Sequence, residues 1–392
     1  MVSPPRSDRT VKDGDPLDER IGSGGSAGAG VQRRWASRRL ALGLSPTPRP
    51  GLVLLLVGMA IGPQGLGVLS HAAITALDPA VSVALAALGA IVGLDLHVRR
   101  AGDVRLFGAA SVEAAATILV VAAGVLIVHA LSPGREPTPW LLALMIGICA
   151  APSSTAADAS AASSHVLAAR IGDLDDVLPI AVGVMAVAWT RPGTPLAVTA
   201  LVTQGGLIAL AIALATGLLM IQTSSESEQR VFAIGALLLL GGAAAHLALS
   251  ALFMGLLAGV FWNVTGTAAR DRIARDVRYL QHPLVVLLLV VAGSQLDLSM
   301  EWWGLVAAYI VLRVIGKLIG GRLAGYVAGR ELPGDAAFSL SAPGVVGIAI
   351  ALNVLQAGDG AAPGATVFAI VIAGSLGSDL LSLAGLGRSR PA

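Results

Sequence analysis

The segment 141–163 reads LLALMIGICAAPSSTAADASAAS, so Ala-Pro and a run of small and hydroxyl side chains interrupt an apolar stretch. A second segment, 336–355, reads AAFSLSAPGVVGIAIALNVL and contains Ala-Pro again. Proline lacks a backbone N–H and clashes with the preceding helical turn. Pro152 and Pro343 therefore predict a break in each segment, although an ordinary proline kink is the alternative for either one alone.

The composition places both segments in a lipid bilayer. Of 392 residues, 55% are hydrophobic and 13% are charged, and the mean hydropathy is +0.79. Soluble domains average about 25% charged residues. The basic residues lack the aromatic interleaving of a nucleic-acid surface, so no nucleic-acid partner is expected. Cys149 is the single cysteine, which excludes an intramolecular disulfide framework and a cysteine-based metal site.

Apolar segments long enough to cross a bilayer follow one another along the chain, and they predict an all-α integral membrane protein. Residues 1–50 are too polar to build a core and predict a disordered basic cytoplasmic tail, which leaves 51–387 as the transmembrane domain. The predicted spans, about twelve in number, are 51–68, 78–97, 105–131, 138–164, 168–190, 195–222, 231–248, 250–266, 283–298, 302–328, 333–357 and 364–386.

The distribution of Lys and Arg supports this series of spans, because cytoplasmic loops of membrane proteins carry an excess of both. Arg135 and Arg191 fall in predicted outer loops, and Arg313 and Lys317 lie inside a span. The rest of the 26 basic residues fall in the tail or on the cytoplasmic side. Both termini are therefore predicted to be cytoplasmic.

The two interrupted spans are the fourth and the eleventh, so they run in opposite directions. Paired broken helices are typical of transporters built from inverted repeats. Backbone groups freed at that depth must line a cavity or be buried in protein. The sequence thus favours a transporter with two broken helices that cross.

Charged residues inside the predicted spans indicate a functional site, since each costs about 2.5 to 3.5 kcal/mol even on the lower scales. Asp175 and Asp176 are expected about two turns into the fifth span, at angles that let both face one cavity. Lys317 and Arg313 lie one turn apart in the tenth span. Glu113, in the third span, would line a cytoplasmic funnel or pair with Arg313. Simple mutual neutralisation of these charges is the alternative reading.

At these residues the sequence resembles the bacterial monovalent cation/proton antiporter superfamily, in its paired-aspartate sodium/proton exchanger branch. The resemblance covers roughly residues 50–387. It is carried by LLLVGMAIGPQGLGVLS at 54–70, ALGAIVGLDLHVRR at 87–100, APSSTAAD at 151–158, DDVLPIAV at 175–182 and IGKLIGG at 315–321.

The resemblance implies a role for each matched residue. Asp176 would bind the transported metal ion and the proton alternately, and Asp175 would pair with Lys317. Arg313 departs from the lysine-type pattern, so which of the two cations pairs with Asp175 stays open. Oxygens of the broken fourth helix that would help to position the ion come from Ser153, Ser154 and Thr155.

The implied function is secondary-active antiport of a monovalent cation, Na+ foremost, against protons. One acid cannot hold both ligands, so alternating exposure of Asp176 to the two sides gives exchange. The resemblance also implies a homodimer in the bacterial inner membrane, with spans three to five and ten to twelve as a mobile core. No enzymatic activity is expected, and no cofactor beyond the transported ions.

Other functions are alternatives to exchange of Na+ against protons. A potassium/proton antiporter, or a potassium-efflux transporter of the glutathione-gated type that lacks its nucleotide-binding domain, is the closest alternative. The sequence after the last span is short and has no GxGxxG pattern, which favours a free-standing antiporter. An intramembrane aspartyl protease needs acids on two facing helices, whereas Asp175 and Asp176 are adjacent. A non-transporting membrane scaffold is a further reading.

Overall fold

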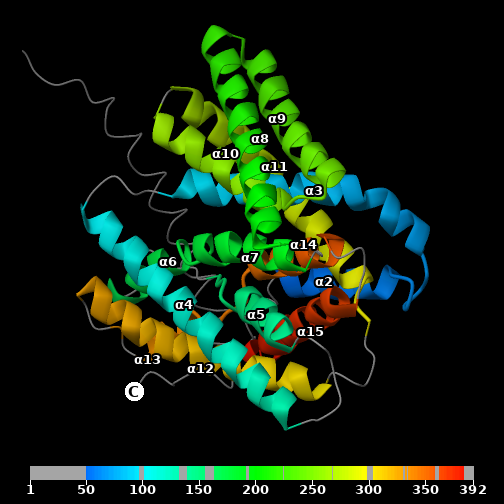
Figure 1. The fold of residues 1–392 in the computed structure, drawn as a ribbon, viewed down its shortest axis with the longest axis vertical. Helices are drawn as coiled ribbons and strands as arrows, with labels where there is room; N and C mark the ends of the chain where they lie inside the picture. Colours follow the sequence, from blue (N-terminus) through cyan, green and yellow to red (C-terminus); the bar gives the residue numbers. More distant parts are fainter. Residues whose placement is uncertain are drawn as a thin grey trace, which may run out of the picture. The chain divides into compact units, whose positions relative to one another are not determined.

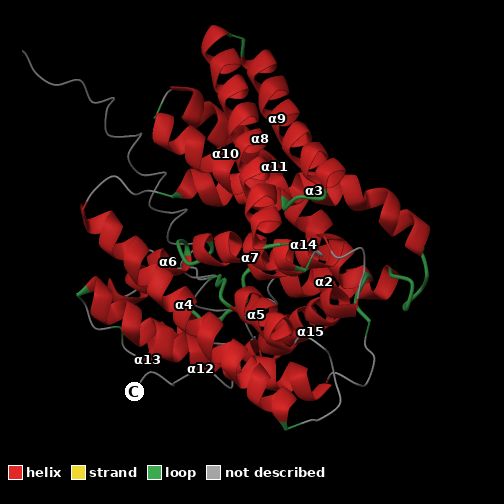
Figure 2. Ribbon diagram, viewed as in Figure 1, coloured by secondary structure: helices red, strands yellow, loops and turns green. Residues whose placement is uncertain are grey.

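The computed structural model describes residues 50–96, 101–131, 139–154, 163–190, 194–223, 225–266, 268–297, 303–329, 332, 334–357 and 362–383. Every regular element within these ranges is a helix (Figure 2). The predicted tail, apart from Pro50, lies outside them. The helices are α2 (Pro50–Ile61), α3 (His71–Asp95), α4 (Ala101–Ala130), α5 (Pro139–Ala150), α6 (Ser163–Gly172), α7 (Val177–Trp189), α8 (Pro195–Gln222), α9 (Glu226–Leu247), α10 (Ala251–Thr265), α11 (Ala268–Ser294), α12 (Trp303–Ala328), α13 (Gly334–Ser339), α14 (Val345–Ala357) and α15 (Ala362–Leu383).

Several of these helices have the length and the composition of membrane spans. Among the described residues, seven are long and apolar enough to cross a bilayer, namely α3, α4, α8, α9, α11, α12 and α15. Shorter apolar helices are α2, α5, α10 and α14. The chain is therefore a multi-pass membrane protein.

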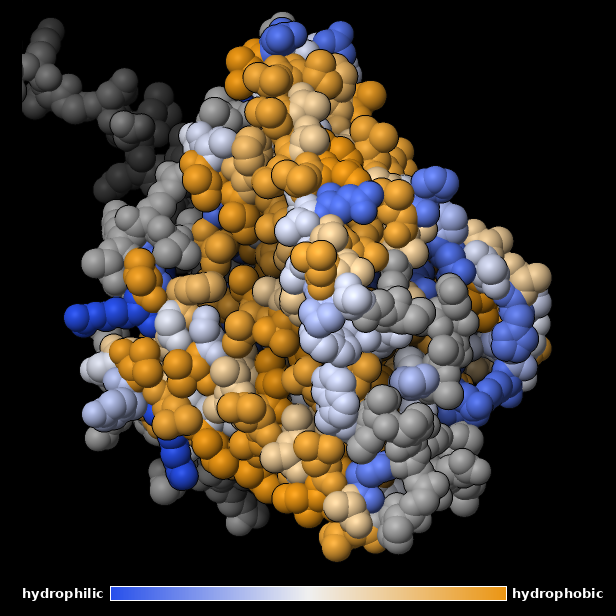
Figure 3. Space-filling view, in the orientation of Figure 1, coloured by the Kyte–Doolittle hydropathy of each residue, from blue (hydrophilic) through white to orange (hydrophobic). Residues whose placement is uncertain are grey.

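Apolar side chains also cover the outside of the helices, as contact with lipid requires. On the face shown in Figure 3, hydrophobic residues dominate the surface over α8, α9, α4 and α12. The large exposed hydrophobic residues of these helices include Leu207, Leu214, Leu218, Leu238, Leu239, Val311, Ile315 and Ile319. A surface of this kind is stable in hydrocarbon and would associate in water.

The helices form two groups of neighbours (Figure 1). In one group α4 packs along α12, α5 packs against both, α15 packs against α12, and α5, α14 and α15 pack against one another. In the other group α3 packs along α10 and α11, and α8 and α9 lie beside α10. The first group contains helices of the third, fourth, tenth, eleventh and twelfth predicted spans and carries both interrupted segments, whereas α7, from the fifth span, contacts helices of both groups.

Both Ala-Pro segments interrupt the helical structure. α5 ends at Ala150 and α14 begins at Val345, so Pro152 and Pro343 each lie in an extended stretch. The two stretches are adjacent, because Ser153 and Pro343 form an isolated antiparallel bridge. The backbone N–H of Ser154 donates to the Ala342 carbonyl at 3.1 Å. Part of the backbone freed by each interruption is thus satisfied by the other.

The structure corrects several boundaries of the predicted spans: α2 ends at Ile61 and not at 68, α11 begins at Ala268 and not at 283, and two further corrections concern the fifth span. The fourth and fifth spans were separated at residues 165–167, but α6 (Ser163–Gly172) runs through that point without a break. The fifth span was predicted as one helix over 168–190, whereas a turn at 173–176 separates α6 from α7. Hydrophobicity alone did not locate this turn, because its acidic residues lie between two apolar runs that read as one.

The contact between α3 and α10 depends on glycine. Gly89 and Gly93 on α3 face Gly255 and Gly259 on α10, and at each of the four a Cβ atom would overlap the backbone of the other helix. Glycine at a spacing of four residues allows this close approach, which maximises van der Waals contact where lipid provides little hydrophobic driving force.

Replacing Gly255 by alanine should therefore destabilise the protein, because the new methyl group overlaps the carbonyl oxygen of Ala86. Overpacking of this kind costs about 1 to 3 kcal/mol. Thermal unfolding of the purified protein in detergent measures the effect as a lower melting temperature. Gly217→Ala on α8 is the matched control, because nothing lies within 4 Å of a Cβ there. An equal loss in both variants would contradict the role of this helix contact.

Candidate functional site

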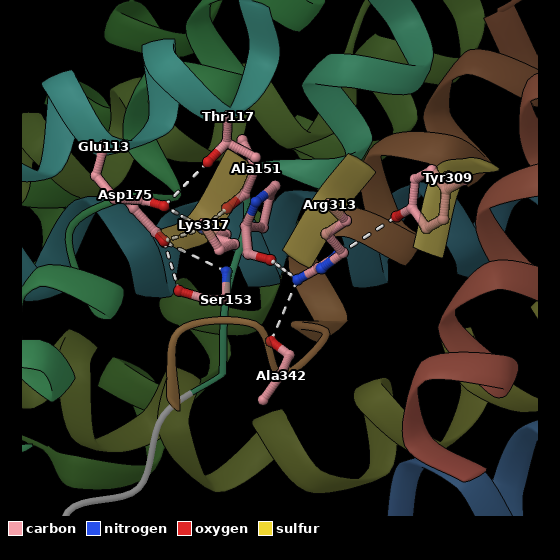
Figure 4. A network of polar contacts seen from close by, with 10 residues as sticks. Glu113, Thr117, Ala151, Ser153, Asp175, Tyr309, Arg313, Lys317 and Ala342 are labelled. Atoms are coloured by element: carbon pink, nitrogen blue, oxygen red, sulfur yellow. Dashed lines mark hydrogen bonds and ion pairs between the residues drawn. The ribbon is translucent and has the colours of Figure 1, made fainter. Parts of the chain in front are cut away.

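The Lys317 side chain is the centre of a buried polar network (Figure 4). Its ammonium nitrogen lies 3.0 Å from Glu113 Oε1 and 2.9 Å from Asp175 Oδ2, and all three side chains are fully buried. The ammonium also donates to the carbonyl oxygen of Ala151, at the end of α5. All three N–H donors of Lys317 therefore have acceptors, two of which are carboxylates, one on α4 and one in the turn before α7.

Glycines on α12 bring Glu113 within reach of Lys317. A Cβ on Gly320 would lie 2.7 Å from the Glu113 carbonyl oxygen, and one on Gly316 would lie 3.1 Å from Thr117 Cα. The backbones of α4 and α12 approach closely at this point as a result. Thr117, one turn after Glu113, donates its hydroxyl to Glu113 Oε1 at 3.1 Å. This hydrogen bond fixes the carboxylate that faces Lys317.

Asp175 connects the network to the first interruption. It lies in the turn between α6 and α7, and its backbone N–H donates to the Ile171 carbonyl at 2.9 Å. The Ser153 hydroxyl donates to Asp175 Oδ2 at 2.5 Å, and the Ser153 N–H points to Oδ1 at 3.4 Å. The expected position, two turns into a continuous helix, is therefore wrong. The turn places the carboxylate beside the extended stretch of Pro152.

Asp176 follows directly and occupies the N-cap position of α7, but its side chain makes no capping hydrogen bond. The residue is half-buried. Its Oδ1 atom is buried and has no hydrogen-bond partner among the residues that the structure describes. Buried carboxylate oxygens normally have a partner. A buried carboxylate oxygen without a partner is a position for a ligand that supplies positive charge or a proton.

Arg313 connects the two interruptions to each other. Its Nη2 atom donates to the Pro152 carbonyl at 2.7 Å and to the Ala342 carbonyl at 3.2 Å (Figure 4). Nη1 lies 3.4 Å from the Tyr309 hydroxyl. The guanidinium is buried and compensates carbonyl groups that lost their helical donors. Arg313 therefore binds the two backbone breaks, and Lys317 binds the carboxylates.

The structure brings together most of the residues that the sequence singled out. Glu113 faces Lys317 and not Arg313, because the two cations occupy different turns of α12. Ser154 is exposed and contributes its backbone N–H to the paired stretch. Thr155 lies outside the described residues.

Two members of the network were missed in the sequence. Thr117 follows Glu113 by four residues, and Tyr309 precedes Arg313 by four. A polar side chain one helical turn from a charged residue in an apolar span is a signal that can identify such partners.

Comparison with known proteins identifies the fold. No protein-family model matches this sequence, and no curated protein matches it. Among solved structures, the chain is similar to the sodium proton antiporter MjNhaP1 from Methanocaldococcus jannaschii, with a TM-score of 0.62 and 15% sequence identity. The similarity covers 93% of this chain and 98% of that one. The chain thus has the fold of a sodium/proton antiporter.

Removing the Lys317 ammonium should destabilise the fold strongly. Lys317→Met leaves Glu113 and Asp175 buried without a counter-charge, and breaking a buried pair in this way costs about 3 to 5 kcal/mol. The melting temperature in detergent measures the loss. The double variant Lys317→Met/Glu113→Gln should recover part of it, because one of the two uncompensated carboxylates is gone.

The control for this prediction is an exposed ion pair on the same protein. Arg278 contacts Asp95, and both side chains are about half exposed. Such pairs contribute roughly 0 to 1 kcal/mol, so Arg278→Met should change the melting temperature little. If Lys317→Met had an effect no larger than that of Arg278→Met, the buried network would not be a major source of stability.

Proposed function

We propose that the chain is a monovalent cation/proton antiporter that exchanges Na+ for protons at Asp176. The observation that carries the proposal is the buried Oδ1 atom of Asp176, which lacks a hydrogen-bond partner in the described part of the chain. It lies next to Asp175 and the Lys317 network, where the two interruptions meet. The sodium/proton antiporter fold supports the same conclusion.

The chemistry follows from competition for one carboxylate. A buried acid without a partner gains most from a species that neutralises it, and both a proton and a stripped Na+ do so. Because the two cannot bind together, the departure of one permits the arrival of the other. If the site is exposed to each side of the membrane in turn, this competition couples the two fluxes.

The surrounding residues have supporting roles in this proposal. Lys317 forms an ion pair with Asp175, so the negative charge next to Asp176 stays compensated while Asp176 exchanges one ligand for the other. Arg313 holds the two broken helices as one unit, and Ser153 with Thr155 supplies further oxygens for the ion. About twelve spans in two inverted repeats carry the site. The group that contains α4, α12 and the interrupted segments moves against the other group.

The proposal also includes the cellular setting. The protein functions as a homodimer in the bacterial inner membrane, with both termini in the cytoplasm. The family resemblance favours the dimer and the membrane, and the distribution of Lys and Arg favours the cytoplasmic termini. Potassium in place of sodium is the remaining choice of cation.

Transport by the full chain in proteoliposomes provides the test. A pH-sensitive dye inside the vesicles reports proton movement after addition of Na+, K+ or Li+. Addition of Na+ should evoke proton movement, and Asp176→Asn should abolish it, because an amide binds neither a proton nor Na+ in place of the carboxylate. Asp173→Asn is the matched control, since this acid belongs to the same turn but is exposed.

Different results would refute different parts of the proposal. Normal exchange in Asp176→Asn would refute the site. A response to K+ but not to Na+ would replace the cation and retain the mechanism. No proton movement with any of the three cations would refute antiport.

A further inference from the structure

A cavity with several polar residues in its lining lies between the two groups of helices, separate from the Lys317 network. Its volume is about 710 Å³, and it is lined by residues of α3, α9, α11, α14 and α15 and of the segment after α2. None of the network residues described above lines it. It lies at the ends of α2, α9, α11 and α14 that the charge distribution predicts to be external.

One face of α3 supplies oxygen atoms to this cavity. Thr75, Asp78 and Ser82 all line it, and their spacing of three and four residues places them on one side of the helix. Pro79 lies inside α3 and has no N–H for the Thr75 carbonyl, which therefore lacks its usual helical donor. A carboxylate and two hydroxyl-bearing residues thus follow one another along the cavity wall.

The facing wall is the outer part of α14. Asn353 and Gln356 line the cavity there, and their spacing of three residues again places them on one side of the helix. The Gln356 side chain lies near the Asp78 carboxylate, and α3 and α14 contact each other, so the two walls meet. Of this pair of helices, α3 belongs to one group of neighbours and α14 to the other.

Two side chains of the cavity are buried but unpartnered. Ser82 and Asn353 are each 6% exposed. Neither makes a side-chain hydrogen bond to any residue in the described ranges, although serine and threonine elsewhere in these helices bond to the carbonyl one turn earlier. Buried polar groups normally have partners, and these two are directed into a water-accessible space. Their polar atoms are therefore available to a molecule or ion in the cavity.

The charge of the lining selects the class of this molecule. The lining residues include no Lys or Arg, and Asp78 is the carboxylate that Gln356 and Ser82 accompany. Carboxylate, carbonyl and hydroxyl oxygens are ligands for hard cations. Asp297, the other carboxylate of the lining, is exposed, so Asp78 alone neutralises a cation in the partly buried part of the cavity, which suits a monovalent ion, whereas a divalent ion would keep an uncompensated charge there. We propose that Asp78, Ser82 and Asn353 form a second, outer binding site for a monovalent cation.

The position of the site suggests what it does. Asn353 follows Val345, the first residue of α14, by eight residues, or about 12 Å along the helix axis at 1.5 Å per residue. One short helix therefore connects the outer cavity with the interruption at Pro343. Binding at Asp78 would raise the local concentration of the cation on the outer side of the Lys317 network. The binding claim itself does not require that the chain be an antiporter.

Cation binding to the purified full-length chain tests the proposal without transport. Isothermal titration calorimetry with NaCl in a choline buffer is carried out on Asp176→Asn, which lacks the proposed central ligand. Saturable Na+ binding should persist in this variant. Adding Asp78→Asn should weaken it by about tenfold or more, because a charge-assisted contact contributes about 1.5 to 3 kcal/mol.

Two further variants separate a built site from a general attraction of cations. Asp297 also lines the cavity but is exposed, so Asp297→Asn should change the affinity less than about twofold by screened surface electrostatics. Asn353→Leu removes a neutral ligand without changing the charge, and it should weaken Na+ binding while the melting temperature in choline stays close to that of the parent.

The results also distinguish this proposal from the antiport proposal. Equal effects of Asp78→Asn and Asp297→Asn, or tighter binding of Mg2+ or Ca2+ than of Na+, would overturn the outer site. So would the absence of saturable Na+ binding in Asp176→Asn. Loss of proteoliposome exchange in Asp176→Asn bears on the central site alone. Persistent Na+ binding in a chain without exchange would retain the outer site and refute antiport.

Discussion

The burial of one ammonium group between two carboxylates is the interaction on which the rest of the site depends. Lys317 is fully buried, and its three donors meet Glu113, Asp175 and the Ala151 carbonyl. Isolated charges of this kind would be costly in an apolar interior. Each member of the network is therefore tolerated because of the others, and the helices that carry them must stay together.

Backbone groups impose a second constraint of the same kind. The two Ala-Pro segments free carbonyl and N–H groups inside a membrane domain, where no bulk water satisfies them. The paired stretches at Ser153 and Pro343 satisfy part of this requirement, and the Arg313 guanidinium satisfies a further part. Arg313, the second cationic residue of α12 in the site, thus stabilises the backbone at the two interruptions. Nη2 of Arg313 donates to both carbonyls while Nη1 faces the Tyr309 hydroxyl, and the single ammonium nitrogen of a lysine does not have this two-nitrogen geometry.

The sequence predicted the helical membrane fold and the charged residues of the network, but not their arrangement. Hydrophobic length and the Ala-Pro repeats identify spans and interruptions, because both are local properties. The turn at 173–176 and the choice of Lys317 over Arg313 as the partner of Glu113 depend on how α4, α6 and α12 approach one another. That approach is set by Gly316 and Gly320, whose contacts are visible only in three dimensions.

The outer cavity extends this comparison, because neither of its walls stands out in the sequence. Asp78 and Asn353 are polar residues in largely apolar helices, and each alone is an ordinary feature of a membrane protein. They gain significance because α3 and α14 belong to different groups of neighbours and contact each other beside Asp78 and Gln356. A cation held between two groups stabilises the arrangement in which they are close. If the groups move against each other during transport, linkage requires that this motion change the affinity of the outer site.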